Sequence, residues 1–158
     1  MCSSDLSPFE IGQMEKAAQV SGKTFDFMAD IIRPGMTEMT LCGEVEAYSR
    51  TLGHSGKLLT RHYRLEGFPF HLMSGASGGL PGALDSPVCG TGTSIAYPYG
   101  AGPKPIMENE PILMDFGTLL DGYHIDESRM FVLGNMPEKA DRASRSAIDI
   151  LYAVQERM

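Results

Sequence analysis

Two aspartates, Asp115 and Asp126, are spaced so that they could act together. Residues 112–117 and 123–133 have the composition of two β-strands, and the Asp121-Gly122 dipeptide between them favours a tight hairpin turn. With those turn residues, Gly117 faces Asp126, and both carboxylates lie on one face as diagonal neighbours, about 7–8 Å apart at the backbone. Gly117 is expected to leave open room between them.

Two carboxylates on one face repel each other unless a positive group lies between them. A pair of divalent metal ions about 3.5–4 Å apart would supply that group, with one carboxylate able to bridge both ions. The same spacing also fits two solvent-facing aspartates, or one that pairs with a basic side chain. Spacing alone leaves these alternatives open.

Two amphipathic helices are expected ahead of the hairpin. The first begins after Ser7, whose spacing to Glu10 is that of a capping box, and ends at an Arg-Pro-Gly turn. The second begins at Thr37 and stops at Gly53. Steps of three and four place one stripe of each helix in the core. These stripes are Ile11, Met14, Ala18, Ser21, Phe25, Met28 and Ile32, followed by Leu41, Val45, Tyr48 and Leu52.

The remaining segments are strands, a long loop and a last helix. Strands are expected at residues 57–63 and 68–73, separated by Glu66-Gly67, and a helix from residues 135–137 through to Met158. Residues 74–102 contain eight glycines and three prolines, and a loop this long in a compact domain is usually functional or disordered. It lacks the glycine spacing of a phosphate-binding loop.

Composition excludes several classes of partner. The 158 residues include 13 basic and 20 acidic residues, a net charge of −7 that repels nucleic acid and anionic membrane surfaces. No apolar stretch approaches the roughly 20 residues of a membrane span, and the N-terminus does not resemble a signal peptide. Three widely spaced cysteines fit reduced thiols, so we expect a cytoplasmic protein.

Residues 1–6 have a different origin from the rest of the chain in our interpretation. A common sequencing adapter would encode the run from Cys2 to Leu6 in one reading frame. We therefore interpret residues 1–6 as a non-native scar.

The hairpin carries a recognisable pattern, Asp115-Phe-Gly-x-x-x-Asp-Gly-Tyr-x-x-Asp126-x-Ser-Arg129-x-Phe131-x-x-Gly134. It resembles the hairpin of the pita-bread metallopeptidases, which include Xaa-Pro dipeptidases, Xaa-Pro aminopeptidases, methionine aminopeptidases and creatinase. The run Ser-Pro-Phe-Glu-Ile at residue 7, the Arg-Pro-Gly-Met-Thr-Glu turn at residue 33 and the Glu-Pro-Ile run at residue 110 are similar to the Xaa-Pro branch.

The resemblance implies an α+β fold, a curved antiparallel sheet backed by helices. Residues 7–158 would be its first half, truncated at the C-terminus, and the parent protein a metal-dependent exopeptidase. Asp115 and Asp126 would be the first two ligands of two divalent ions, manganese or cobalt, with zinc or iron as alternatives. The implied substrate is a short peptide with proline in second position, and a homodimer is compatible with the resemblance.

One departure from the family concerns a histidine that usually precedes the first aspartate. Residues 94–102 contain none, although Tyr97 or Tyr99 could supply a hydroxyl there. His124, on the face of Asp126, is a further candidate pocket residue. His71 lies too far upstream to match the spacing, and we expect it to be a strand-end histidine with a local hydrogen bond.

A second departure is that the remaining ligands implied by the resemblance, a histidine and two glutamates, are expected beyond Met158. Two carboxylates hold two metal ions poorly, so we expect this chain alone to bind metal weakly and to be inactive. Alternative interpretations are a creatinase-like hydrolase of small molecules or a catalytically silent binding module of the same fold.

Overall fold

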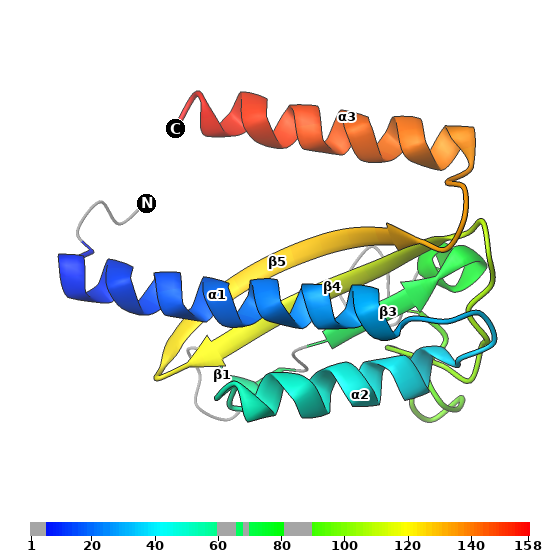
Figure 1. The fold of residues 1–158 in the computed structure, drawn as a ribbon, viewed down its shortest axis with the longest axis horizontal. Helices are drawn as coiled ribbons and strands as arrows, with labels where there is room; N and C mark the ends of the chain where they lie inside the picture. The colour runs from blue at the N-terminus through cyan, green and yellow to red at the C-terminus, as the bar shows by residue number, and fades with distance from the viewer. Residues whose placement is uncertain (1–5, 60–65, 68–69, 81–89) are drawn as a thin grey trace.

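Helices and two antiparallel sheets make up the computed structural model, which describes residues 6–59, 66–67, 70–80 and 90–158 (Figure 1). One sheet pairs β1 with β2, and the other has the strand order β3-β4-β5. The α+β expectation is therefore confirmed. In chain order the elements are α1 (Pro8–Ile31), α2 (Glu38–Thr51), β1 (Leu58–Leu59), β2 (Glu66–Gly67), β3 (Phe70–Ser74), the 3₁₀ turn η1 (Gly75–Gly79), β4 (Pro111–Leu120), β5 (Tyr123–Val132) and α3 (Glu138–Gln155).

Side-chain caps fix where the first two helices begin. The Ser7 hydroxyl accepts a hydrogen bond from the Glu10 N–H, and the Glu10 carboxylate accepts one from the Ser7 N–H at 2.7 Å. Thr37 caps α2 through its hydroxyl, which accepts from the Thr40 N–H at 3.1 Å. Each cap satisfies backbone donors that have no partner inside the helix. Both predicted starts are confirmed.

The core lies between the sheet and helices α1 and α2, which cover one of its faces (Figure 1). Phe116 in β4 is fully buried, stacks on Phe70 with ring centroids 4.4 Å apart, and meets the Phe25 ring edge-on at 6.2 Å. Such rings bury large apolar areas, so this cluster supplies much of the hydrophobic stabilisation. The buried cluster comprises Phe25, Met28, Leu41, Val45, Phe70, Leu72, Ile106, Ile112, Met114 and Phe116.

The predicted stripe of α1 is wrong in its first turns. Ile11 is 46% exposed, whereas Gln13 and Ala17 are buried. The N-terminal end of α1 projects beyond the sheet (Figure 1), so the core does not select the apolar side chains there. Ser21, Phe25 and Met28 are buried as predicted, and Ile32, which follows the helix, is partly buried against the core.

The strands before the long loop also differ from expectation. Glu66-Gly67, expected to separate the two strands, forms β2, in which Gly67 pairs with Leu58 of β1. A Cβ at Gly67 would lie 3.4 Å from the Leu58 Cβ, at van der Waals contact. Residues 60–65 and 68–69 of the expected strands lie outside the described residues.

The β4–β5 hairpin has the predicted register. Asp121 and Gly122 have φ values of 50° and 87°, as a two-residue type I′ turn requires. Gly117 pairs with Asp126, and Asp115 pairs with Ser128. Register therefore follows directly from the turn chemistry.

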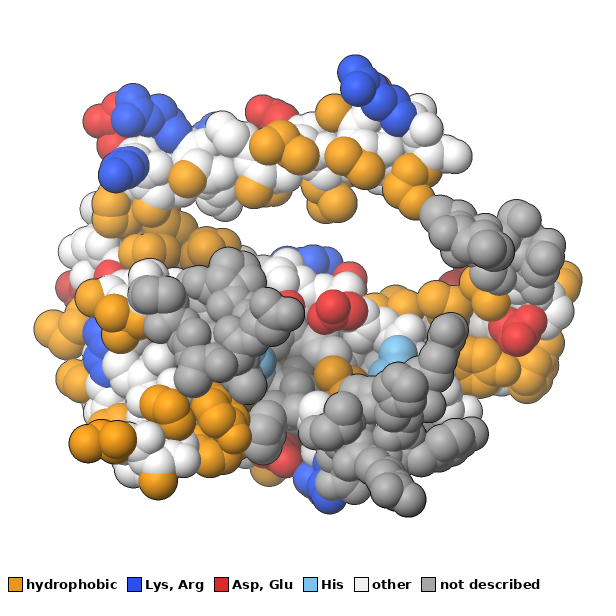
Figure 2. Space-filling model, turned by 180° about the vertical axis from the view of Figure 1, so that it is seen from behind, with side chains coloured by type: hydrophobic (Ala, Val, Ile, Leu, Met, Phe, Trp, Pro, Cys, Tyr) orange, Lys and Arg blue, Asp and Glu red, His pale blue; other side chains and the backbone are white. Residues whose placement is uncertain are grey.

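Helix α3 stands apart from the sheet and buries none of its residues. Ion pairs one turn apart, such as Glu138–Arg142 at 3.2 Å, line its polar face. Its apolar side is exposed, with Leu151 at 63% and Val154 at 50%, and faces an open gap in Figure 2. The helix ends at Gln155, earlier than the predicted continuation to Met158. Among the described residues, no helix has the length and apolarity to cross a bilayer.

The buried His54 is expected to make stability depend on pH. Its Nδ1 accepts a hydrogen bond from the Leu119 N–H at 3.0 Å, and burial followed by the charge of Arg50 lowers its pKa below the ordinary 6.5. The unfolded chain therefore binds a proton more readily than the folded one. The contribution of neutral His54 to the free energy of unfolding should be fully present above pH 6.5. It should be lost as the pH falls from 6.5 to the lowered pKa.

Urea unfolding at several pH values checks this, with His54→Asn as the comparison because its side-chain oxygen keeps an acceptor for Leu119 without titrating. The difference in unfolding free energy between the two proteins should change below pH 6.5. A constant difference would contradict the prediction.

Candidate metal-binding face and adjacent cavity

Asp115 and Asp126 lie on the same face of the β4–β5 hairpin, opposite to the core. The space above Gly117 is not open, contrary to expectation. A Cβ at Gly117 would lie 2.5 Å from the Leu58 Cδ1, because β1 crosses this face and its leucine occupies the place of the missing side chain. Gly117 thus admits Leu58 beside the aspartates.

The two carboxylates differ in their surroundings. Asp115 is half-buried and accepts a hydrogen bond from the Ser128 hydroxyl at 2.5 Å. Partial burial, followed by the negative charge of Asp115, raises the pKa of Asp126, and a positive charge on His71 opposes that rise. The face therefore disfavours two negative charges, and a bound cation would relieve that cost.

His71 lies on the aspartate face, a position that the sequence analysis did not predict. It pairs directly with Asp115 across β3 and β4, so the two side chains share the aspartate face. His71 is the second residue of β3, close to the strand end as expected, and the β3–β4 register brings it next to Asp115, 44 positions away in the chain. No local pattern around His71 marks this pairing.

The tyrosines and His124 lie in two different places. The rings of Tyr97 and Tyr99 are 4.1 Å apart between centroids, and burial, then the neighbouring Tyr99, raise the pKa of Tyr97. His124 lies on the face of Asp126, and its Nε2 accepts a hydrogen bond from the Leu59 N–H at 3.3 Å. Tyr97 and Tyr99 line the same cavity as His71. His124 instead links β5 to β1 through its hydrogen bond with Leu59.

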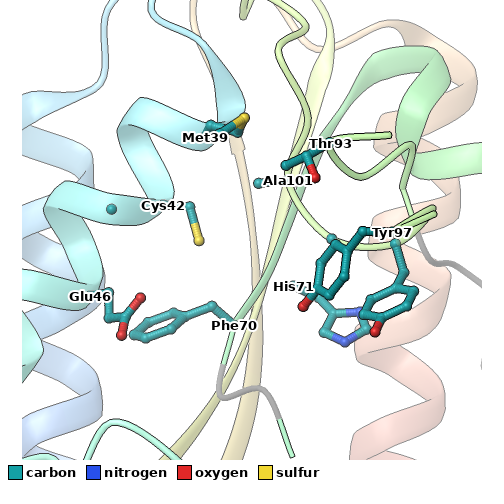
Figure 3. A pocket seen from close by; sticks show the side chains of 11 residues that line it. Met39, Cys42, Glu46, Phe70, His71, Thr93, Tyr97 and Ala101 are labelled. Carbon is teal, nitrogen blue, oxygen red and sulfur yellow. The ribbon is translucent and has the colours of Figure 1, made fainter. Parts of the chain in front are cut away.

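A cavity of about 240 Å³ lies between α2, the β3 edge and residues 93–101 (Figure 3). His71 and both tyrosines are part of its wall. Cys42 is another wall residue, and burial raises the pKa of its thiol to about 12, so the thiol is neutral and unreactive. The other lining residues are Met39, Gly43, Glu46, Phe70, Thr93, Gly100 and Ala101.

Glu38, a fully buried carboxylate at the start of α2, fixes the loop segments around this cavity. It accepts hydrogen bonds from the Ser74 N–H at 2.7 Å, the Ser74 hydroxyl at 2.8 Å, the Gly102 N–H at 3.0 Å and the Ser77 hydroxyl. Lys104 donates to the Ser74 hydroxyl at 2.9 Å and brings a positive charge nearby. In the sequence Glu38 is indistinguishable from an ordinary first-turn acidic residue.

The donor set fits a divalent cation only in part. Carboxylate oxygens suit hard or borderline ions such as manganese. Within the described ranges, however, no group of three or more His, Cys, Asp or Glu residues is arranged to hold a metal ion. In the part of the chain that the structure describes, Asp115 and Asp126 therefore do not form a complete metal site by themselves.

Comparison with known proteins places these features in a family. The model of metallopeptidase family M24 matches residues 12–158. A methionine aminopeptidase of Clostridium perfringens is 25% identical over 140 residues, which cover 86% of this chain and 47% of the relative. The chain spans about half the length of that curated relative.

Solved structures share the fold. The X-Pro aminopeptidase of Thermotoga maritima superposes with a TM-score of 0.66 at 22% identity, covering 87% of this chain and 32% of that one. The prolidase of Pyrococcus furiosus superposes with a TM-score of 0.64 at 22% identity, and the match covers 86% of this chain and 33% of the prolidase. The sheet, its helices and the aspartate hairpin are therefore part of the pita-bread fold, and the chain belongs to metallopeptidase family M24.

Proposed function

We propose that residues 7–158 form the first half of the catalytic domain of a metal-dependent exopeptidase. The observation that carries this proposal is the hairpin register, which sets Asp115 and Asp126 side by side on one exposed face. Membership of family M24 supports it, as does the partial coverage of longer relatives. The uncovered apolar side of α3 offers a surface on which a second half would pack.

In the complete site, Asp115 and Asp126 would each hold a divalent ion, manganese or cobalt, with zinc or iron as alternatives. Such ions supply Lewis-acid activation of water and of a peptide carbonyl. Ser128 would keep the Asp115 carboxylate oriented through its hydrogen bond. Because two carboxylates provide too few donors, the chain alone would bind metal weakly and leave peptides intact.

The substrate of the complete enzyme would be a short peptide, with proline in second position as the preferred case. The names of the Thermotoga and Pyrococcus proteins support this choice. Tyr97 and Tyr99 would belong to the substrate pocket, because they line the cavity beside His71. His124 would contribute to the wall of the aspartate face instead.

A creatinase-like hydrolase or a silent binding module of the same fold is the second candidate. Residues 94–102 favour it, since they carry tyrosines where the resemblance implies a histidine. Tyrosine donates a hydrogen bond but titrates near pH 10, so it exchanges protons poorly at neutral pH. Intact metal ligands in the second half would favour the enzyme.

A manganese titration of the 158-residue chain tests the role of the aspartates. Paramagnetic Mn²⁺ should broaden amide NMR signals around residues 115 and 126, and Asp115→Asn or Asp126→Asn should weaken binding about tenfold or more, because each removes a charged ligand. Asp121→Asn is the matched control, since it makes the same change at the hairpin turn, where asparagine also tolerates positive φ. Equal Mn²⁺ affinity in all four proteins would contradict the proposal.

A further inference from the structure

We propose that two copies of this 158-residue chain pair through the free edge of β5 and form a two-fold symmetric dimer. The strand order β3-β4-β5 leaves one edge of β5 without a strand partner among the described residues. Antiparallel pairing of two such edges joins the sheets of both copies into one continuous sheet, with β5 of each copy at its centre. The pairing requires neither a metal ion nor the aspartate carboxylates, so it does not depend on the proposed function.

The β5 edge lacks the features by which edge strands usually avoid pairing. Such strands are often very short, bulged, or interrupted by proline or lysine. β5 is 10 residues long, pairs with β4 in an unbroken register, and contains neither proline nor lysine. Helix α3 buries none of its residues, and an open gap separates it from the sheet in Figure 2. The edge is therefore long, regular and accessible to another strand.

The hairpin turn determines which backbone groups of β5 point to the free edge. The residues on either side of a two-residue turn form a hydrogen-bonded pair, so the odd-numbered residues of β5 direct their N–H and C=O groups to β4. The same groups of Asp126, Ser128 and Met130 therefore point outward. In agreement, the Ser128 C=O accepts a hydrogen bond from its own neighbour, Arg129 Nη1, at 2.9 Å.

The charges of β5 make the strand complementary to a second copy of itself in one register. When Ser128 lies opposite Ser128 of the second copy, Glu127 of each copy lies opposite Arg129 of the other. Opposite charges directly across antiparallel strands stabilise the pair, and like charges destabilise it. Centring the pairing on residue 126, 127 or 129 instead sets two identical charges against each other. Charge complementarity therefore favours a second copy as the partner and Ser128 as the centre.

The two charged side chains are placed to make this contact. Arg129 and Glu127 of one copy already form an ion pair at 3.2 Å, with 52% and 26% of their side chains exposed. The Arg129 guanidinium lies over the Phe25 ring, 5.1 Å from its centroid, which limits its freedom before pairing. A second copy brings another such pair alongside, so that each guanidinium gains a second carboxylate. Networks of this kind contribute more than an isolated surface ion pair.

Analytical ultracentrifugation of the 158-residue chain, with a metal chelator present, tests the dimer. The average mass should rise with protein concentration toward twice that of one chain. Glu127→Arg and Arg129→Glu each set like charges opposite each other at two positions, so each should weaken dimerisation about tenfold or more. Both substitutions in one chain, or an equal mixture of the two single variants, restore opposite charges and should restore the dimer. Glu44→Arg is the matched control, because it makes the same change at an exposed residue of α2.

Amide hydrogen exchange locates the contact. The N–H groups of Asp126, Ser128 and Met130 should exchange more slowly as the protein concentration rises, because only the second copy supplies their acceptors. A chain that stays monomeric, or a dimer that both single variants leave unchanged, would overturn the proposal. Slow exchange at these positions that is independent of concentration would also overturn it, since a segment of the same chain would then cover the edge. If circular dichroism shows Arg129→Glu to be unfolded, Glu127→Arg and the exchange pattern decide.

Discussion

Replacing Glu38 by alanine is expected to lower the free energy of unfolding by about 3–5 kcal/mol. The carboxylate is fully buried and accepts hydrogen bonds from two backbone N–H groups, of Ser74 and Gly102, and from two serine hydroxyls. Alanine would leave these donors without their acceptor, at about 1–3 kcal/mol for each buried group that finds no new partner. Urea denaturation monitored by circular dichroism measures the loss.

Two variants separate the buried network from ordinary effects of charge removal. Glu44→Ala changes an exposed glutamate of the same helix and should alter stability by no more than about 0.5 kcal/mol. Glu38→Gln keeps one acceptor oxygen and should fall between the wild type and Glu38→Ala. If Glu38→Ala and Glu44→Ala were equally stable, the network would have no measurable role.

Phe116→Ala is expected to lower the free energy of unfolding by a similar amount, about 3–5 kcal/mol, because it opens a cavity at the centre of the core. Phe116 is fully buried and touches the rings of Phe70, Phe25 and His54. A domain of this size is stable by only about 5–15 kcal/mol, so the variant should be marginally folded at 25 °C. Thermal and urea unfolding both measure this effect.

Phe9→Ala is the matched control for Phe116→Ala. Phe9 is 68% exposed in the first turn of α1, so its removal should change stability by about 0.5 kcal/mol or less. A loss at Phe116 as small as the loss at Phe9 would mean that the stacked rings are not the centre of the core.

The sequence predicted best those features that short-range chemistry decides. A turn with positive φ at Asp121 and Gly122 permits essentially one register, so the shared face of Asp115 and Asp126 followed from a dipeptide and strand alternation. Helix starts were equally predictable, because caps act within three residues.

The features that were not predictable depend on contacts between distant segments. His71 reaches Asp115 only through the β3–β4 pairing, and Leu58 covers Gly117 only because β1 crosses the hairpin. Glu38 gains its role from Ser74 and Gly102, 36 and 64 residues away. Periodicity within one helix or strand contains no information about such partners.

The isolation of α3 has a consequence for cooperativity. Helices in proteins gain most of their stability from tertiary packing, and none of the 18 residues of α3 is buried, so little burial offsets the entropy lost on ordering this helix. Local unfolding of α3 is therefore uncoupled from unfolding of the rest of the chain and costs little free energy. In contrast, α1, α2 and the β3-β4-β5 sheet unfold together. Amide exchange would separate the two units, and the stability of this chain is, in thermodynamic terms, a property of residues 8–132.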